Sequence, residues 1–360
     1  MILLSKRPSF TGCLCFLFLF VMFPALTAQI WEKEEKAFQR VDQLRQKVRH
    51  RADSLSKGRF GAIDKLLTNR YMTGNYDTLY IRRPDEKWTV RSRLNVSGAR
   101  INALAMDADT RMESEMRADY KATASITVSY LGLAAGIALN PKALVGKYKD
   151  YEFNLNSYNN RFGFDVIYQN AKRFEGWYKM GNDKKINADK GAMSEKSFNV
   201  NAYYAFNFRH FSYPAAFSQT YIQKRSAGSL LAGISCEWQE IKHRFDEEGD
   251  VYKLKANNFS IGAGYGYNWV PSGRWLIHFS SIPTFIVARY DRIKINDETH
   301  KMKNKFPELI LTARGAVVYN FRRYFLGVSM VYNFSKIGDD DHLELRHIKW
   351  RSRAFIGLRI

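Results

Sequence analysis

The clearest pattern in the chain is a strict alternation of apolar and polar positions between Asn258 and Trp269. From Phe259 onward every second residue is apolar or aromatic, whereas the positions between them are Ser, Gly or Asn. Successive side chains of a β-strand point to opposite faces, so the segment predicts a strand with one apolar face and one small, polar face. Strands of about 9–11 residues that span a membrane have this character, with the apolar face toward lipid and the polar face toward a lumen.

Similar alternation recurs along the rest of the chain and predicts an all-β fold, a transmembrane antiparallel β-barrel with a short N-terminal helical extension. About twelve strands fit the pattern, and ten is the alternative number. The predicted strands are 88–96, 121–130, 131–139, 149–158, 161–170, 197–207, 228–238, 257–270, 274–289, 307–320, 322–335 and 347–360.

The lengths of the connections predict how the barrel is oriented. Barrels of this class have short periplasmic turns and longer outer loops. With the C-terminus in the periplasm, the long, charged connections all become outer loops. These predicted outer loops are 98–120, 140–148, 171–196, 239–256, 290–306 and 336–346.

One connection, from Phe208 to Ala227, is long although it lies on the periplasmic side. It is rich in aromatic residues, and an exposed aromatic segment of this size is unfavourable in water. We expect it to fold inward or under the barrel as a partial plug, with Pro214 helping to fix its shape. The alternative is one irregular strand followed by a wide turn.

The N-terminal region predicts export. Lys6 and Arg7 precede an apolar run, Cys13–Phe23, that is too short to span a membrane as a helix. We therefore expect a cleaved signal peptide at 1–28, a periplasmic helical extension at 29–75 and an outer-membrane β-barrel at 76–360. Apolar residues recur at helical spacing within Trp31–Lys57, which supports the helix.

Composition and charge narrow the expected partners. The chain contains 25 Phe, 21 Tyr and 7 Trp and has a net charge of +21, which fits aromatic girdles and anionic solutes or lipids. We expect contact with outer-membrane lipid and lipopolysaccharide, a periplasmic protein partner as a possibility, and no nucleic acid. Lysines of the predicted outer loops would meet lipopolysaccharide phosphates; they are Lys184, Lys185, Lys301 and Lys303. Cleavage would leave Cys236 as the one cysteine, so no intramolecular disulfide is expected.

Five arginines of the first and last strands fall on faces opposite the apolar ones: Arg91, Arg93, Arg351, Arg353 and Arg359. Because these two strands close the barrel, the arginines should be neighbours in the lumen. Two interpretations stay open. The arginines either form a basic wall for anionic solutes, or pair with acidic groups of a plug or of another strand.

Two His-x-Ser pairs are weak enzyme candidates: His210 with Ser212, and His278 with Ser280. A spacing of two places a base and a nucleophile on one strand face, as in outer-membrane phospholipases, whose site opens to lipid. Here His278 and Ser280 would instead point into the lumen. No residue is therefore assigned as catalytic, and whether the protein is an enzyme is left open.

Other motifs give no cofactor or metal site. Gly262-x-Gly264-x-Gly266 has a period of two and precedes no helix, unlike a nucleotide-binding loop, and predicts a curved or unobstructed wall. Asp339–Asp341 could bind calcium, although such loop charges are usually only solvated. No His or Cys cluster has zinc-site spacing. No cofactor is expected.

Three blocks resemble a known family. They are Asp77-Thr78-x-Tyr80-Ile81 leading to Trp88-Thr89-Val90-Arg91, Phe211-Ser212-Tyr213 leading to Lys224-Arg225-Ser226-Ala227-Gly228-Ser229, and the hairpin from Asn154–Tyr158 to Phe162–Asp165. Together they resemble a domain-of-unknown-function family of secreted Gram-negative outer-membrane β-barrel proteins, over residues 70–360. The resemblance implies an outer-membrane barrel and implies no activity or catalytic position.

The function expected from these observations is a narrow pore or transport protein with a basic lumen. A lipid-modifying barrel enzyme is one alternative. A structural or scaffolding barrel with a periplasmic partner is another.

Overall fold

The computed structural model describes residues 74–107, 110–130, 133–139, 151–244, 251–295, 298–301, 308–339 and 343–360. They belong to the second of two compact units, Tyr71–Ile360. The expected signal peptide at 1–28 and the helical extension, apart from its last two residues, lie outside the described residues. No helix within the described part is long and apolar enough to cross a membrane.

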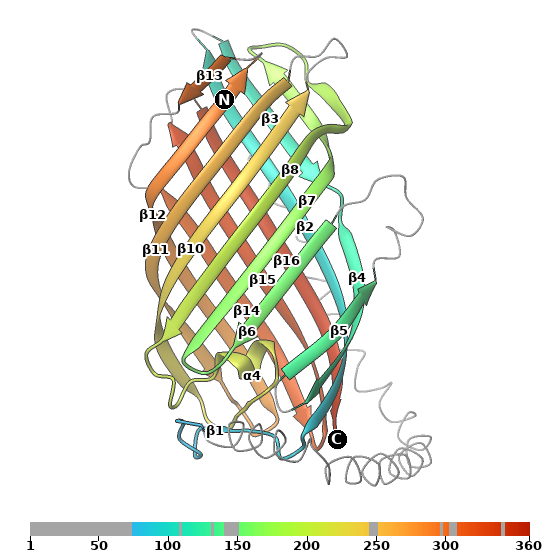
Figure 1. Cartoon of the computed structure of the whole chain (residues 1–360), viewed down its shortest axis with the longest axis vertical. Coiled ribbons are helices and arrows are strands. Elements are labelled where there is room, and N and C mark those ends of the chain that lie inside the picture. The colour runs from blue at the N-terminus through green and yellow to red at the C-terminus, as the bar shows by residue number, and fades with distance from the viewer. Residues whose placement is uncertain are drawn as a thin grey trace, which may run out of the picture. The chain divides into compact units, whose positions relative to one another are not determined.

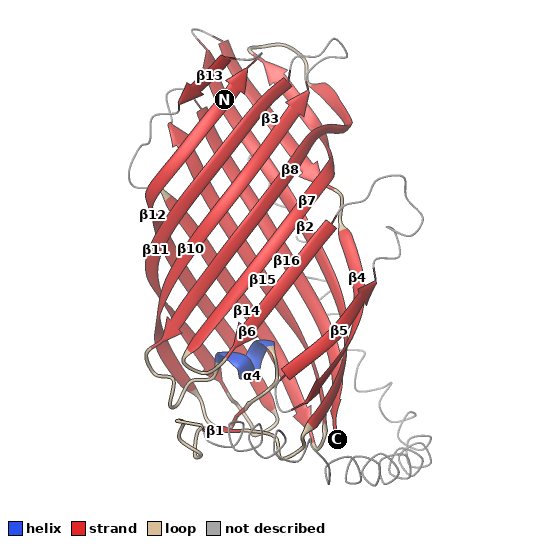
Figure 2. Ribbon diagram, in the orientation of Figure 1, coloured by secondary structure: helices blue, strands red, loops and turns tan. Residues whose placement is uncertain are grey.

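The described chain is almost entirely antiparallel strand, with one short helix (Figure 2). The strands of the wall are β2 Trp88–Asp107, β3 Thr110–Ala118, β4 Lys121–Tyr130, β5 Leu133–Leu139, β6 Tyr151–Tyr158, β7 Phe162–Met180, β8 Ile186–Ala205, β10 Ala227–Arg244, β11 Val251–Trp269, β12 Trp275–Ile295, β13 Glu298–Lys301, β14 Leu309–Phe321, β15 Tyr324–Asp339 and β16 Leu343–Arg359. Two short strands, β1 Ile81–Arg82 and β9 Ile222–Gln223, and the helix α4 Tyr213–Phe217 complete the fold.

Pairing of the last strand with the first closes the barrel, as expected. β16 pairs with β2 from Leu343↔Ala105 to Arg359↔Thr89. Among the described residues, the closed ring runs β2, β16, β15, β14, β12, β11, β10, β8, β7, β3 and back to β2. We call the end that holds the C-terminus and the short turns the turn end, and the opposite end the loop end (Figure 1).

The wall differs between its two halves. Near the loop end, β3 pairs with β2 on one side and β7 on the other. Near the turn end, β2 pairs instead with β4, β4 with β5, and β7 with β6. All twelve predicted strands are therefore present in the turn-end half, while a ring of ten closes the loop-end half. The prediction of an antiparallel barrel is confirmed.

Five of the predicted outer loops are wrong in part, because the strands continue through much of them. β2 runs on to Asp107, and β3 lies wholly within the predicted loop 98–120. The predicted loops 171–196, 239–256, 290–306 and 336–346 likewise contain ends of β7, β8, β10, β11, β12, β15 and β16, and all of β13. The predicted loop 140–148 lies outside the described residues.

The physical reason is a change in the outer face of the strands. Beyond the apolar stretch, outward positions carry charges that pair across strands. Examples are Arg100 with Glu115, 3.8 Å apart, and Lys253 with Glu240, 3.2 Å apart. The backbone ladder continues although the apolar alternation has ended, so a pattern of hydrophobicity places each strand end too early.

Exposure confirms which strand face is outward. On β11, Phe259, Ile261 and Tyr265 are 39%, 50% and 52% exposed, whereas Ser260 and Asn268 are fully buried. The same outward faces on other strands carry Ile126, Val128, Phe162, Phe164, Phe198, Leu230, Ile234, Phe279, Phe285, Leu326, Met330 and Ile356. These exposed apolar side chains follow the turn-end half of the wall, as a lipid-facing belt requires.

The connection that follows β8 enters the barrel. Its helix α4 lies inside the turn end (Figure 1), and all five of its residues are buried. Ser212 caps the helix by accepting a hydrogen bond from the Ala215 amide, and Pro214 stands in the first turn, where a missing amide proton costs nothing. The expected inward fold of this connection is confirmed. We call residues 208–226 the plug.

Apolar packing and a small sheet hold the plug. Phe211, Tyr213 and Phe217 pack in one buried cluster with wall residues such as Leu231 and Val318. Beneath them, β1 pairs with β9. The Lys224 amide donates to the Tyr80 carbonyl at 2.7 Å, and the Asp77 amide to the Arg209 carbonyl at 2.9 Å. Two of the sequence blocks that carry the family resemblance therefore meet at the plug.

Candidate functional site in the barrel lumen

A chain of buried polar side chains joins the wall to the plug. His278 Nδ1 lies 2.7 Å from Asn268 Oδ1, and His278 Nε2 lies 2.9 Å from Ser280 Oγ. Ser280 Oγ is in turn 2.7 Å from the hydroxyl of Tyr213, on α4. All four residues are at most 2% exposed. The predicted pair His278 and Ser280 is thus brought together, with Asn268 in the position that orients the base of a catalytic triad.

The chain continues to the opposite wall. Arg314 of β14 donates to the Tyr213 hydroxyl at 3.1 Å and to Asp165 of β7 at 3.2 Å. Asp165 also accepts a hydrogen bond from the Tyr158 hydroxyl. Hydrogen bonds to charged groups are worth roughly 1.5–3 kcal/mol each, so Arg314, which Asp165 holds in place, fixes the side chain of Tyr213 within the lumen.

Wall residues on two sides of the lumen donate hydrogen bonds to backbone and side-chain oxygens of the plug. Asn268 Nδ2 donates to the Ser212 carbonyl and to Gln223 Oε1, both at 2.9 Å. Arg91 donates to the Ser218 carbonyl at 2.7 Å and to Gln219 Oε1 at 3.0 Å. Wall residues thereby satisfy polar groups of the plug that would otherwise be buried without partners.

A second set of contacts lies under the plug. Tyr221 accepts a hydrogen bond from Arg83, and its ring lies edge-on to Tyr76 at 5.6 Å. Burial raises the pKa of the Tyr221 phenol, and the nearby Arg83 guanidinium opposes that rise. The segment in front of β2, which contains Tyr76 and Arg83, therefore supports the plug from the turn end.

The other His-x-Ser pair is not arranged as a base and nucleophile. His210 lies 3.3 Å from Asp77 and 3.1 Å from Asn207. Ser212 donates to Asn160 at 2.7 Å and caps α4. Both residues hold the plug in shape, because the turn in front of α4 removes the two-residue strand spacing on which the sequence argument depended.

The predicted lumen arginines do lie on the inner faces of the paired strands β2 and β16. Arg91 and Arg359 bind the plug, since Arg359 lies 3.4 Å from the Gln219 carbonyl. Arg351 and Arg353 line a cavity farther toward the loop end. The groups that Arg91 and Arg359 meet on the plug are carbonyl and amide oxygens rather than carboxylates, and a basic wall for anionic solutes stays a prediction.

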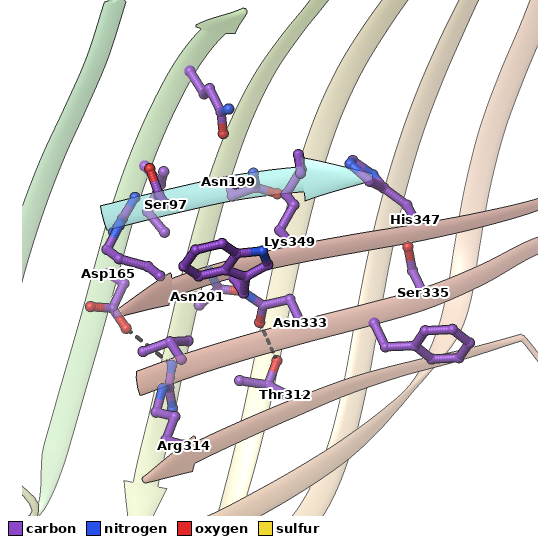
Figure 3. A pocket seen from close by; sticks show the side chains of 18 of the residues that line it. Ser97, Asp165, Asn199, Asn201, Thr312, Arg314, Asn333, Ser335, His347 and Lys349 are labelled. Atoms are coloured by element: carbon purple, nitrogen blue, oxygen red, sulfur yellow. Dashed lines mark hydrogen bonds and ion pairs between the residues drawn. The ribbon is translucent and has the colours of Figure 1, made fainter. Parts of the chain in front are cut away.

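The cavity has a volume of about 120 Å³ and lies between α4 and the loop-end half (Figure 3). Phe217 of α4 borders it on one side, and His347 and Lys349 border it toward the loop end. Asparagine and serine side chains of β8 and β15 line much of the rest, as Figure 3 shows for Asn201 and Asn333. Its cations Lys121, Arg314, Lys349, Arg351 and Arg353 outnumber its carboxylates Asp119, Asp165 and Glu237.

Beyond the cavity, a buried ion pair narrows the lumen. Glu195 of β8 lies 2.8 Å from Lys349 and accepts a hydrogen bond from Gln239 at 2.9 Å. An apolar cluster that includes Ile101, Met116 and Phe174 lies on inner faces of the loop-end half. Charged and apolar groups thus line the lumen on the loop-end side of the cavity.

Sequence reasoning missed several of these residues. Asp165, Arg314 and Glu195 all occupy inward positions of predicted strands or their extensions. Their inward orientation could therefore have been predicted from the alternation along each strand. Their ion-pair partners could not have been predicted, because the pairs join β7 with β14 and β8 with β16, which are far apart in the chain.

One of the remaining predicted features, Gly266, lies at this site. Gly266 lets the plug approach the wall, since a Cβ there would lie 3.0 Å from Phe211. Lys184 and Lys185 are exposed near the loop end. The side chains of Asp339–Asp341, Lys301 and Lys303 lie outside the described residues. Cys236 is a free thiol on the outer face of β10. In the described part of the chain, no three His, Cys, Asp or Glu side chains cluster as metal ligands would.

Comparison with known proteins gives a family match and distant barrel likenesses. Residues 75–359 match the model of the family described as Domain of unknown function (DUF4421). No curated protein matches the chain.

Three solved structures illustrate the likeness. The outer membrane protease OmpT from Escherichia coli shares 7% identity, over 78% of this chain and 98% of that chain, with a TM-score of 0.40. The translocator domain of autotransporter NalP from Neisseria meningitidis shares 8%, over 83% and 94%, with a TM-score of 0.32. The toluene transporter TodX of P. putida shares 8%, over 77% and 91%, with a TM-score of 0.26. Likeness at this level concerns the barrel alone and carries no information on activity.

Proposed function

The chain belongs to the DUF4421 family of domains of unknown function, and we propose that it is an outer-membrane barrel that passes small anionic solutes through a narrow, plugged lumen. The observation that carries the proposal is the cavity, where cations outnumber carboxylates in a space of about 120 Å³. Fixed charges of one sign raise the local concentration of the opposite ion and exclude ions of their own sign.

The plug supplies the gate in this proposal. Its contacts with the wall combine an apolar cluster with hydrogen bonds to Asn268, Ser280, Arg91 and Arg314. The segment leaves the wall after β8 and returns to it at β10, so it can move while the ladder of the barrel stays intact. In this proposal, the described conformation corresponds to the closed state.

Conductance of the purified protein in planar bilayers tests this function. The intact protein should conduct little, and deletion of Ser212–Gln223 should raise the conductance of an assembled barrel. In a salt gradient, the deletion variant should prefer anions, and that preference should fall when Arg351→Gln and Arg353→Gln are added.

Lys196→Gln is the matched control, because Lys196 is exposed and lies on the outer face of β8 between Phe198 and the loop end. It should leave the selectivity unchanged. Unchanged conductance in a correctly assembled deletion variant would refute the role of the plug as a gate. A preference for cations would refute the proposal that the solutes are anionic.

A second candidate function, lipid hydrolysis, is favoured by the geometry of Ser280, His278 and Asn268. The two contacts of 2.9 Å and 2.7 Å match a nucleophile, a base and an orienting group. The Tyr213 hydroxyl is hydrogen-bonded to Ser280 Oγ and stands where a substrate would approach it, so hydrolysis requires displacement of the plug. Phospholipid hydrolysis by the plug-deletion variant, lost on Ser280→Ala, would support this function. Equal turnover in the two proteins would contradict it.

A further inference from the structure

The cavity in the lumen has two walls of different chemistry. In the order of the closed ring, β14, β15 and β16 stand across the lumen from β7, β8 and β10. The first side carries Arg314, Arg351 and Arg353, and we call it the cationic wall. The second side carries amide and hydroxyl groups, and we call it the amide wall; these groups belong to Gln169, Asn199, Asn201 and Ser235.

The register of the strands aligns cations along the cationic wall and beyond it. Arg314 of β14 is the ladder partner of Val331 of β15, and Val331 is that of Arg351 of β16. Arg351 lies opposite Ser97 of β2, whose other partner is Lys121 of β4. Arg314, Arg351 and Lys121 therefore stand at one level of the barrel. Positive groups at one level favour a solute group with several acceptor oxygens, such as a carboxylate or a phosphate.

Cations of the cationic wall already hold the carboxylates of the amide wall. Asp165 lies 3.2 Å from Arg314 (Figure 3), and Glu237 lies 3.6 Å from Lys349. A cationic solute would have to compete with these ion pairs across the lumen. An anionic solute meets the excess of cations instead.

Neutral polar groups of the amide wall lie in register as well. Asn201 of β8 is flanked by Asp165 of β7 and Ser235 of β10, and the Ser235 hydroxyl donates to Asn201 Oδ1 at 2.6 Å. Thr312 and Asn333 add a hydroxyl and an amide from β14 and β15 (Figure 3). Amides and hydroxyls both donate and accept hydrogen bonds, as the hydroxyl groups of a sugar do. An aliphatic solute could not exchange hydrogen bonds with them.

The size of the cavity admits a solute of several non-hydrogen atoms. Its volume of about 120 Å³ exceeds the roughly 10–15 Å³ that one water molecule requires. A halide ion would meet the cationic wall alone, whereas an anionic group joined to several hydroxyls can contact both walls. Ligand sites commonly fix orientation by a few such convergent polar groups.

We propose that the cavity is a binding site for an anionic monosaccharide, a sugar with one carboxylate or phosphate group. Its acid group meets Arg351 and Lys121, while its hydroxyls meet Asn201 and Ser235. This inference rests on the basic cavity of the proposed function and names the class of solute that the barrel passes. It also accounts for the amide wall, which anion conduction alone does not require.

Titration calorimetry of the assembled protein in detergent micelles tests the site with matched ligands. The probes are D-glucuronate and D-glucose 6-phosphate, and the tighter of the two identifies the acid group. It should bind at least roughly tenfold more tightly than hexanoate, which has the charge without the hydroxyls. The same margin should hold over D-glucose, which has the hydroxyls without the charge.

Asn201→Leu removes one amide from the amide wall. It should weaken binding of the tighter probe roughly tenfold without weakening that of hexanoate. Arg351→Gln should weaken binding of both anions. Asn187→Leu is the matched control, because Asn187 is exposed on the same strand, and it should bind as the wild type does. Heat-modifiable migration in gels shows whether each variant has assembled; if Asn201→Leu has not, the comparison of ligands on the wild-type protein decides.

Equal affinity for hexanoate and the sugar anions would overturn the proposal, since charge alone would then account for binding. Equal affinity for D-glucose would overturn it too, as would equal binding of the tighter probe by assembled Asn201→Leu and wild-type protein. If neither sugar anion binds while the plug-deletion variant prefers anions, the sugar site fails and the pore stands. Selective binding of a sugar anion without anion conductance would refute the pore and leave the sugar site.

Discussion

At the level of single residues, Tyr213 connects the plug to both sides of the lumen. Its hydroxyl meets Ser280 on β12 and Arg314 on β14, and its ring packs against Tyr203 with centroids 4.4 Å apart. Arg314 keeps Asp165 as a second partner, so loss of the hydroxyl would not leave its charge unpaired. The Tyr213 hydroxyl is therefore the atom whose removal weakens the plug with least damage to the wall.

We expect Tyr213→Phe to weaken the closed state by about 1–3 kcal/mol, because buried hydrogen bonds to Ser280 and Arg314 are lost while the ring stays. The measurement is the frequency of channel openings in planar bilayers, which should rise in an assembled barrel. Tyr265→Phe makes the same change on the lipid face of β11 and should leave the opening frequency unaltered. Equal behaviour of the two variants would show that the hydroxyl does not hold the plug.

At the level of the element, each long strand has two segments with different surroundings. β11 carries apolar outward side chains from Phe259 to Trp269, but outward lysines at 253 and 255. The backbone is one continuous strand, so the change lies in what its outer face meets. A charge added to that face should therefore be tolerated in one segment and not in the other.

We expect Ala263→Arg to impair folding into bilayers, because a charge at the lipid face near the midplane costs about 2–4 kcal/mol. Ser194→Arg, on the outer side of β8 near the loop end, should fold normally because its surroundings are aqueous. Urea titration of both variants in vesicles measures the difference. Equal stability would contradict the lipid-facing belt.

At the level of the whole molecule, the two ends of the barrel are chemically distinct. The turn end holds the plug, the C-terminus and the exposed turn around Ser272, whereas the loop end carries Lys184 and Lys185. In the proposed orientation the turn end faces the periplasm. The two ends should therefore differ in their access to reagents outside the cell.

A cysteine at Lys185 should react with an impermeant thiol reagent on intact cells, and one at Ser272 should react only after the cells are opened. Both substitutions are made in a Cys236→Ser background, so that the native thiol does not contribute. Mass spectrometry of the labelled protein provides the measurement. Reaction at Ser272 alone on intact cells would invert the orientation.

The sequence by itself determined the local properties of the wall. Alternation along a strand is a two-residue period that needs no partner, so the spans, their inner and outer faces, and the lumen position of His278, Ser280 and the arginines were all predictable. The aromatic content of residues 208–227 likewise predicted burial, because so many rings are unfavourable in water.

Only the tertiary structure decided what depends on register between distant segments. Nothing in one strand reveals that β3 inserts between β2 and β7, or that Arg314 reaches both Tyr213 and Asp165 across the lumen. Strand ends were also misplaced, because hydrogen bonds between backbones continue after the apolar pattern stops. Partners across a closed barrel are set by the stagger of its ladders, which the sequence of one strand does not contain.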